Sequence, residues 1–230
     1  MSTGAASDVI VTAIRERLRE LAEPERAPAM QAYMKSAMPF LGVRVPVVRS
    51  VVRDVAREHP PAGLDDLQAA ATALWREAGV REERYAATGL TGLPLARGRL
   101  ELLPLHHEMI VTGAWWDHVD EIAHRVGATL LAHPDEMSPL LRSWARDDDL
   151  WLRRCAVISQ LGLGGRTDAA LLADAIDANL ADREFFVRKA IGWALRDYGR
   201  TDPDWVRQFV AARHDTLSPL SRREALKHLA

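Results

Sequence analysis

The sequence predicts an all-α protein, an α-solenoid built of HEAT-like antiparallel helix pairs. Helical hydrophobic periodicity runs along almost the whole chain, and strand-like alternation is nearly absent. Short connections rich in Pro and Gly separate the periodic stretches, which favours antiparallel neighbours. A short pattern also recurs about every 35 residues. With 230 residues, 48% of them hydrophobic, the chain can bury a sizeable core.

The helices are placed by their start and stop signals. The first two are expected at 7–21 and 24–37. Pro46 suits the first turn of a third helix that ends at 59, because its missing N–H has no partner there in any helix. Pro60, Pro61 and Gly63 then break the chain. Further helices are expected at 64–78, 82–93, 99–112, 115–130, 135–146, 149–162, 168–181, 184–199, 203–213 and 218–229.

The recurring pattern is Arg-x-Ala-aliphatic, which begins at Arg84, Arg154, Arg188 and Arg223. Arg188 follows Arg154 by 34 residues and precedes Arg223 by 35. Asp120 fills the missing position, 36 residues after Arg84 and 34 before Arg154. Five such units predict a single HEAT-like repeat domain over 1–230, whose inner helices line a concave groove. Asp120 is the one acid in a column of arginines, which marks it as a candidate functional residue.

The segment from Trp115 to Asp120 carries the clearest chemical signal. Trp116 and Asp120 are four residues apart, so a helix places them on one face. An aromatic plane beside a carboxylate suits a positively charged ligand. Because adjacent side chains on a helix point about 100° apart, one of Trp115 and Trp116 is expected in the core and Trp116 is expected to be presented. The alternative is an ordinary core Trp and a surface Asp.

Two further residues, Arg154 and Trp193, join this site by spacing. Trp193 follows Arg154 by 39 residues, and Trp116 precedes it by 38, so each separation is about one repeat. On neighbouring inner helices, these residues and Asp120 would converge on the concave face. An arginine there suits a phosphate, and the alternative is that the residues are unrelated. Tyr33 is a weaker candidate, since its spacing from nearby methionines also fits a core position.

Charge and cysteine usage narrow the function classes. A net charge of −2 counts against a strongly basic nucleic-acid binder, so a DNA-binding protein of this composition needs a locally basic groove. The single cysteine, Cys155, excludes an internal disulfide and fits a reducing cytoplasm. No apolar run approaches the roughly 20 residues that cross a bilayer. The first eight residues lack the features of a secretory signal.

At these residues the sequence resembles a known family, the bacterial DNA alkylation repair glycosylases of the AlkD type, which are built from HEAT-like repeats. The match runs from about residue 25 to the C-terminus. Its most specific parts are the Trp-Trp-Asp segment and Lys-Ala-Ile-Gly-Trp at 189–193. The other segments that carry the resemblance are 32–35, 39–42, 151–154, 184–186, 195–198 and 219–225.

The resemblance implies excision of N3- and N7-alkylated purines from duplex DNA, without a metal or organic cofactor. By position in the matching segments, Trp116 and Trp193 would flank the sugar of the damaged nucleotide, and Asp120 would sit at the glycosidic bond. Arg154 would hold a backbone phosphate, and Tyr33 would add to the aromatic surround. The resemblance also implies that, unlike ordinary glycosylases, the enzyme does not extrude its target base into a tight pocket.

The implied chemistry agrees with the residues. A purine alkylated at N3 or N7 is already cationic, so its departure needs no general acid, and Asp120 would stabilise the positive charge that moves to the sugar. The alternative is a non-catalytic HEAT-like scaffold that binds DNA or protein, although a scaffold has no need of a carboxylate between indoles. We expect a cytoplasmic monomer, because a polar first helix and a charged last helix would cap the array.

Overall fold

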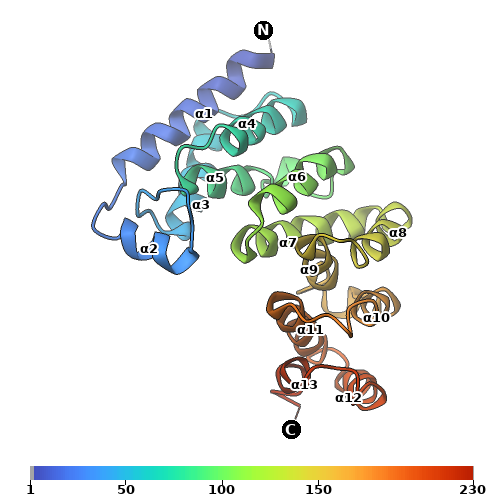
Figure 1. Cartoon of the computed structure of the whole chain (residues 1–230). Helices are drawn as coiled ribbons and strands as arrows, with labels where there is room; N and C mark the ends of the chain where they lie inside the picture. The colour runs from blue at the N-terminus through green and yellow to red at the C-terminus, as the bar shows by residue number, and fades with distance from the viewer. Residues whose placement is uncertain (1–2, 230) are drawn as a thin grey trace. The chain divides into compact units, whose positions relative to one another are not determined.

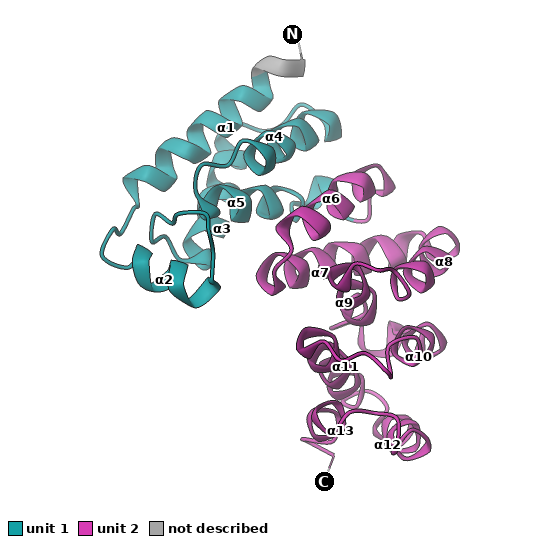
Figure 2. Ribbon diagram, viewed as in Figure 1, with its two compact units in different colours: residues 1–97 teal, residues 98–230 magenta. Residues whose placement is uncertain are grey.

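The computed structural model describes residues 3–229. Over this range the chain forms thirteen α-helices and three short 3-10 helices and contains no strand, so the all-α prediction is confirmed. None of these helices is long and apolar enough to cross a membrane. The chain divides into two compact units, residues 1–97 and 98–230, coloured separately in Figure 2. The single repeat domain over 1–230 stays a prediction.

The first unit contains five α-helices and one 3-10 helix. The helix α1 packs on α3, α4 and α5, and α5 also packs on α3 and α4. Val48, Val51, Val52 and Val55 form one buried stripe on α3, with the i, i+3, i+4, i+7 spacing of an amphipathic helix. The elements are α1 (Thr3–Glu20), α2 (Ala27–Met34), α3 (Val45–Glu58), α4 (Leu64–Arg76), α5 (Arg81–Leu90) and η1 (Pro94–Ala96) (Figure 1).

A buried carboxylate organises the loop between α2 and α3. Glu82, on α5, is 0% exposed and accepts hydrogen bonds from the backbone N–H groups of Leu41 (3.0 Å), Gly42 (2.9 Å) and Val43 (3.1 Å). Gly42 has a φ of +89°, and a Cβ at this position would lie 2.1 Å from the carbonyl oxygen of Glu23. Only glycine therefore fits this turn. The three N–H groups satisfy the buried charge, so the loop and the acid stabilise each other.

The second unit is a succession of helix pairs. The helices α7, α9, α11 and α13 pack one on the next, while α8 packs on α7 and α9, α10 on α8 and α9, and α12 on α11 and α13. Figure 1 shows this order from green to red. The elements are η2 (Leu100–Leu102), α6 (Leu103–Gly113), α7 (Trp116–Ala132), α8 (Pro134–Trp144), α9 (Leu150–Ile158), η3 (Gly164–Arg166), α10 (Ala169–Asp177), α11 (Phe185–Tyr198), α12 (Pro203–Ala212) and α13 (Pro219–Ala225).

Hydrogen bonds between neighbouring pairs follow the period seen in the sequence. Asn179 donates to the carbonyl oxygen of Ala145, 34 residues earlier, at 2.8 Å. The backbone N–H of Gly162 donates to Asp197, 35 residues later, at 2.7 Å. The helices also approach closely where side chains are smallest: a Cβ on Gly127 of α7 would lie 2.1 Å from the carbonyl oxygen of Ser159. Hydrogen bonds at the repeat spacing therefore join neighbouring helix pairs of the second unit.

Most expected helices lie where the sequence placed them, but several end earlier. The helix α2 stops at Met34 rather than 37, because Lys35 adopts the left-handed conformation (φ 50°, ψ 38°) and its N–H bonds back to the carbonyl oxygen of Ala32. At the other end of the chain α13 stops at Ala225 rather than 229. Asp149 caps α9 by accepting the N–H groups of Trp151 and Leu152, as its position before the helix predicts.

Candidate active site

Asp120 and Arg154 meet in a two-bond ion pair between α7 and α9. Arg154 Nε donates to Asp120 Oδ1 at 2.8 Å, and Nη2 donates to Oδ2 at 2.9 Å. The side chain of Arg154 is only 5% exposed, whereas that of Asp120 is 18% exposed. The pair joins residues 34 positions apart, which is one repeat. The spacing that placed both residues in one column thus corresponds to a direct contact.

The guanidinium of Arg154 is also bound from the other side. Its Nη1 donates to the carbonyl oxygen of Phe186, in the first turn of α11, at 2.5 Å. Burial raises the pKa of the Asp120 carboxyl, while the hydrogen bond from Arg154 opposes that shift. Arg154 therefore fixes the orientation of Asp120 and favours its ionised form. These three Arg154 donors are directed at protein acceptors rather than at a ligand. Contact between Arg154 and a phosphate therefore stays a prediction.

The turn before α7 separates the two indoles. Ala114 ends α6 in the left-handed conformation (φ 40°), and Trp115 follows with extended backbone as the N-cap residue of α7. The Trp115 ring packs against Trp151 and Phe186, with ring centroids 6.0 and 5.4 Å apart. Trp116 begins the helix and is partly exposed, one turn before Asp120. Trp115 is also only partly exposed, so the prediction that one of the two indoles is a core residue is wrong, although the Trp115 ring packs within the protein.

The supporting aromatic cluster of Trp115, Trp151 and Phe186 was not predicted as such. Trp151 and Phe186 lie 5.1 Å apart between ring centroids, which completes the triangle. The signal was available in the repeat, since Trp151 follows Trp115 by 36 residues and Phe186 follows Trp151 by 35. The cluster joins the N-terminal ends of α7, α9 and α11, the same three helices that contribute Asp120, Arg154 and the carbonyl group bound by Arg154.

Trp193 lies on α11, which packs on α9, and its side chain is partly exposed. Asp120, Arg154 and Trp193 therefore lie on α7, α9 and α11, which pack one on the next. Only Asp120 and Arg154 are brought into direct contact. The convergence of Trp193 with Trp116 around a ligand remains a prediction.

Tyr33 lies on α2 in the first unit, and its side chain is 75% exposed. The alternative interpretation of Tyr33 as a core residue is therefore wrong. A large aromatic side chain in water has room to contact a partner, since it is not needed by the protein interior. Its role at a binding surface remains a prediction.

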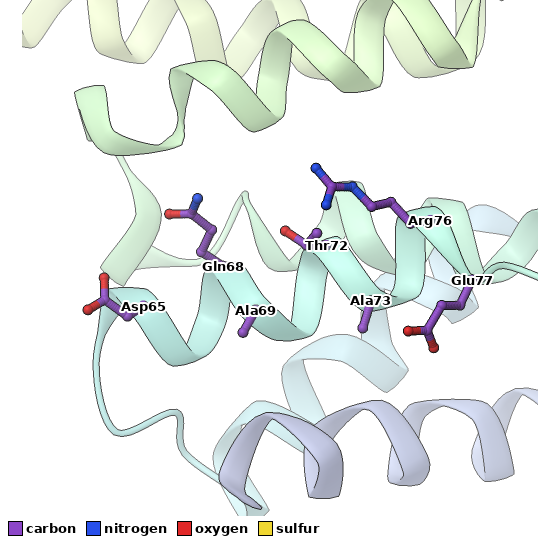
Figure 3. Close-up of a pocket in the computed structure, with 7 residues that line it drawn as sticks. All are labelled: Asp65, Gln68, Ala69, Thr72, Ala73, Arg76 and Glu77. Carbon is purple, nitrogen blue, oxygen red and sulfur yellow. The ribbon is translucent and has the colours of Figure 1, made fainter. Parts of the chain in front are cut away.

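Three other features of the described residues could carry chemistry: a pocket, a metal site and the single cysteine. A pocket of about 560 Å³ follows one side of α4, and none of the predicted site residues lines it (Figure 3). Its lining consists of Asp65, Gln68, Ala69, Thr72, Ala73, Arg76 and Glu77. Between residues 3 and 229, no group of three or more His, Cys, Asp or Glu side chains could hold a metal ion. Cys155 is buried, and burial raises the pKa of its thiol, so it is not poised to react.

Comparison with known proteins identifies the family. Residues 14–229 match the family model described as DNA alkylation repair enzyme. A solved structure described as a predicted DNA alkylation repair enzyme from Enterococcus faecalis is 31% identical, with a TM-score of 0.78 over 91% of this chain and 97% of that one. Curated proteins give no significant match.

Two more distant structures share the fold. AlkD2 from Streptococcus mutans is 17% identical, with a TM-score of 0.63 over 81% of this chain and 90% of that one. The protein smu.31 from Streptococcus mutans UA159 is also 17% identical, with a TM-score of 0.62 over 81% of this chain and 99% of that one. The family match covers most of the chain, and the range that it matches includes the Trp-Trp-Asp segment. The chain therefore belongs to the family of DNA alkylation repair enzymes.

Proposed function

We propose that this repair enzyme is a DNA glycosylase that hydrolyses the N-glycosidic bond of cationic N3- and N7-alkylated purines in duplex DNA. The observation that carries the proposal is the Asp120 carboxylate, which Arg154 orients with two hydrogen bonds while part of the acid stays exposed. An ionised carboxylate has about four acceptor positions, and Arg154 occupies two of them. The remaining positions are available to a substrate and to water.

The chemistry follows from the charge of the substrate. An N3- or N7-alkylated purine leaves as a neutral base, so bond cleavage needs no proton from the enzyme. Positive charge then develops on the sugar, where a fixed carboxylate stabilises it and orients the attacking water. Because Arg154 holds Asp120 before the substrate arrives, little reorganisation is needed as the charge forms. No metal or organic cofactor enters this mechanism.

The neighbouring aromatic side chains complete the proposal. Trp116 lies one helical turn before Asp120 and is partly exposed, so its ring can face the sugar on the same side as the acid. Trp193 would flank the sugar from α11. Indole faces attract a developing cation, which adds to the effect of the carboxylate. Tyr33 would stack or pack against the DNA from α2, and Arg154 would add a phosphate contact.

The proposed substrate is double-stranded DNA that carries alkylated purines, bound by a cytoplasmic monomer. A net charge of −2 requires that the DNA-facing surface be more basic than the rest. The second candidate, a HEAT-like scaffold that binds DNA or protein without catalysis, makes no use of Asp120. The two candidates therefore differ in a measurable way.

Release of free 3-methyladenine and 7-methylguanine from methylated duplex DNA tests the proposal. We expect Asp120→Asn to keep binding to lesion-containing DNA and to lose most excision, about 100-fold or more, as when a group that stabilises transition-state charge is removed. Asp174→Asn is the matched control, because Asp174 also accepts a hydrogen bond from an arginine, Arg142, at 2.7 Å. Wild-type excision by the Asp120 variant would remove Asp120 from the mechanism, and no excision by the wild-type enzyme would leave the scaffold.

The phosphate role of Arg154 has its own test. Arg154→Ala should weaken duplex binding and make its salt dependence shallower, because each lost phosphate contact lowers the slope by about 0.9. An unchanged slope with reduced excision would assign Arg154 to positioning Asp120 alone.

A further inference from the structure

One acid of α13 lies over a single face of α11. Glu224 Oε1 binds Lys189 Nζ at 2.9 Å, and Glu224 Oε2 accepts a hydrogen bond from Arg196 Nη1 at 2.6 Å. Lys189, Gly192 and Arg196 have the i, i+3, i+7 spacing of one helix face. A Cβ on Gly192 would lie 2.5 Å from Glu224 Cβ and 3.0 Å from the carbonyl oxygen of Ser221, so α13 approaches α11 closely at this glycine. The absence of a side chain at 192 is what lets one carboxylate reach both cations.

The same face carries Trp193. This residue follows Gly192 directly, four positions after Lys189 and three before Arg196, so both cations are its neighbours on the helix surface. The hydrogen bond from Lys189 lowers the pKa of Glu224, which is therefore ionised at neutral pH. Two positive charges beside Trp193 share one negative charge.

Contacts other than those of Glu224 also hold α13 against α11. Ser221 Oγ donates to the carbonyl oxygen of Arg188 at 2.9 Å, and Ser221 and Ala225 are buried on the α11 side of α13. The side chain of Glu224 itself is 14% exposed, and those of Lys189 and Arg196 are 39% and 21% exposed. The three charges therefore sit at the rim of the helix contact, where an incoming anion can reach the cations.

We propose that Glu224 competes with the DNA backbone for Lys189 and Arg196 and thereby restrains the binding of undamaged duplex. The inference rests on the proposed function, which brings DNA to Trp193. A cation that is already paired with a carboxylate gives less affinity to a phosphate, because the carboxylate must first be displaced. Sequence-independent attraction to the DNA backbone is thus reduced beside Trp193, the residue proposed to flank the damaged nucleotide.

The test is the salt dependence of binding to undamaged duplex. For Glu224→Gln, which keeps size but removes the charge, we expect about fivefold tighter binding near 0.1 M salt and a salt slope steeper by about 1, the change for one added phosphate contact. Asp177→Asn is the matched control, because Asp177 also joins neighbouring helix pairs through an arginine, Arg213, at 2.5 and 2.6 Å. It removes the same charge at another place. Equal behaviour of the two variants would overturn the proposal.

A second substitution tests which cation is released. In the Glu224→Gln background, Lys189→Gln should restore a wild-type slope, while in the wild-type background it should change the slope by much less than 1. A full loss of about one unit in the wild-type background would mean that Lys189 already binds phosphate, which contradicts the proposal. If thermal unfolding shows that the Glu224→Gln variant does not fold, the salt slope of Lys189→Gln in the wild-type background tests the proposal by itself.

The outcome is separable from that of the proposed function. If the wild-type enzyme binds duplex but excises no alkylpurine, the glycosylase proposal fails and the Glu224 comparison keeps its meaning. If the wild-type enzyme does not bind duplex at all, the proposed function fails and the inference fails with it.

Discussion

Each compact unit contains a carboxylate that is held by more than one hydrogen bond, and the two carboxylates are held in different ways. Glu82 in the first unit is 0% exposed and is bound by three backbone N–H groups of one loop. Asp120 in the second unit is bound by one arginine side chain and stays 18% exposed. Backbone donors that enclose a carboxylate, as at Glu82, make its hydrogen bonds contribute to the stability of the fold. A side-chain donor from one direction orients a carboxylate and leaves an edge for other partners.

The largest effect should come from the enclosed acid. We expect Glu82→Ala to lower the free energy of unfolding by about 4 kcal/mol, because three buried N–H groups lose their acceptor. Urea unfolding at neutral pH measures this loss. Glu101→Ala is the control, since Glu101 is exposed and pairs with Arg99 at the surface, and its removal should cost under about 0.5 kcal/mol. A small loss for Glu82→Ala would show that the loop does not depend on the acid.

A third buried titratable group sharpens the comparison, because it has no hydrogen-bond partner. His106, on α6, is 1% exposed, and neither of its ring nitrogens is hydrogen-bonded. Burial lowers its pKa from 6.5 to about 4, with a further contribution from Arg125. The unfolded chain therefore binds more protons between these values, so stability is full above pH 6.5 and falls by about 3 kcal/mol as the pH drops to 4.

Urea unfolding across this pH range, with His106→Leu, measures that contribution. The variant should lose the part of the pH dependence that is due to His106, whatever its stability at neutral pH. His59→Gln is the control, because His59 is exposed at the end of α3. An identical pH profile for the wild-type and His106→Leu proteins would contradict the assignment.

Excision should depend more on the geometry of the side chain that binds Asp120 than on the charge of that side chain. We expect Arg154→Lys to lower single-turnover excision about tenfold, because lysine keeps the charge but cannot supply two parallel hydrogen bonds. Arg142→Lys, at the single-bond pair with Asp174, should leave excision unchanged. Wild-type excision by the Arg154 variant would mean that the two-bond geometry is not what prepares Asp120.

The smallest effect concerns the backbone beside the site. Lys35 and Ala114 are the residues other than glycine that have positive φ in the described part of the chain. Lys35 lies two residues after Tyr33, and Ala114 lies directly before Trp115. Ala114→Gly should raise the unfolding free energy by about 0.5 kcal/mol, because glycine adopts this conformation without strain. A thermal melt measures the shift. Destabilisation would show that the conformation of Ala114 is not strained.

The repeat made most of the second unit predictable. A period of about 35 residues placed Asp120 and Arg154 on neighbouring helices, and the structure joins them directly. The glycine and proline breaks predicted the order of the helices. These features are local or periodic, so one sequence carries them.

The missed features depend on contacts that no period describes. Glu82 binds a loop about 40 residues earlier through backbone groups, which leave no mark on side-chain patterns. Glu224 reaches Arg196 across 28 residues, and this requires the close helix approach at Gly192. The early end of α2 at Lys35 depends on a left-handed residue that is not glycine. Such geometry is set by tertiary packing rather than by propensity.

The ion pair of Asp120 and Arg154 also joins two consecutive helix pairs of the second unit. Separation of the pair α7 and α8 from the pair α9 and α10, even by partial unfolding far below the melting temperature, would take the arginine away from the acid. Repair activity should therefore be lost while most helical content remains. The activity would thus depend on the contact between neighbouring helix pairs, since Asp120 is oriented for the proposed chemistry only when Arg154 of the next pair is in place.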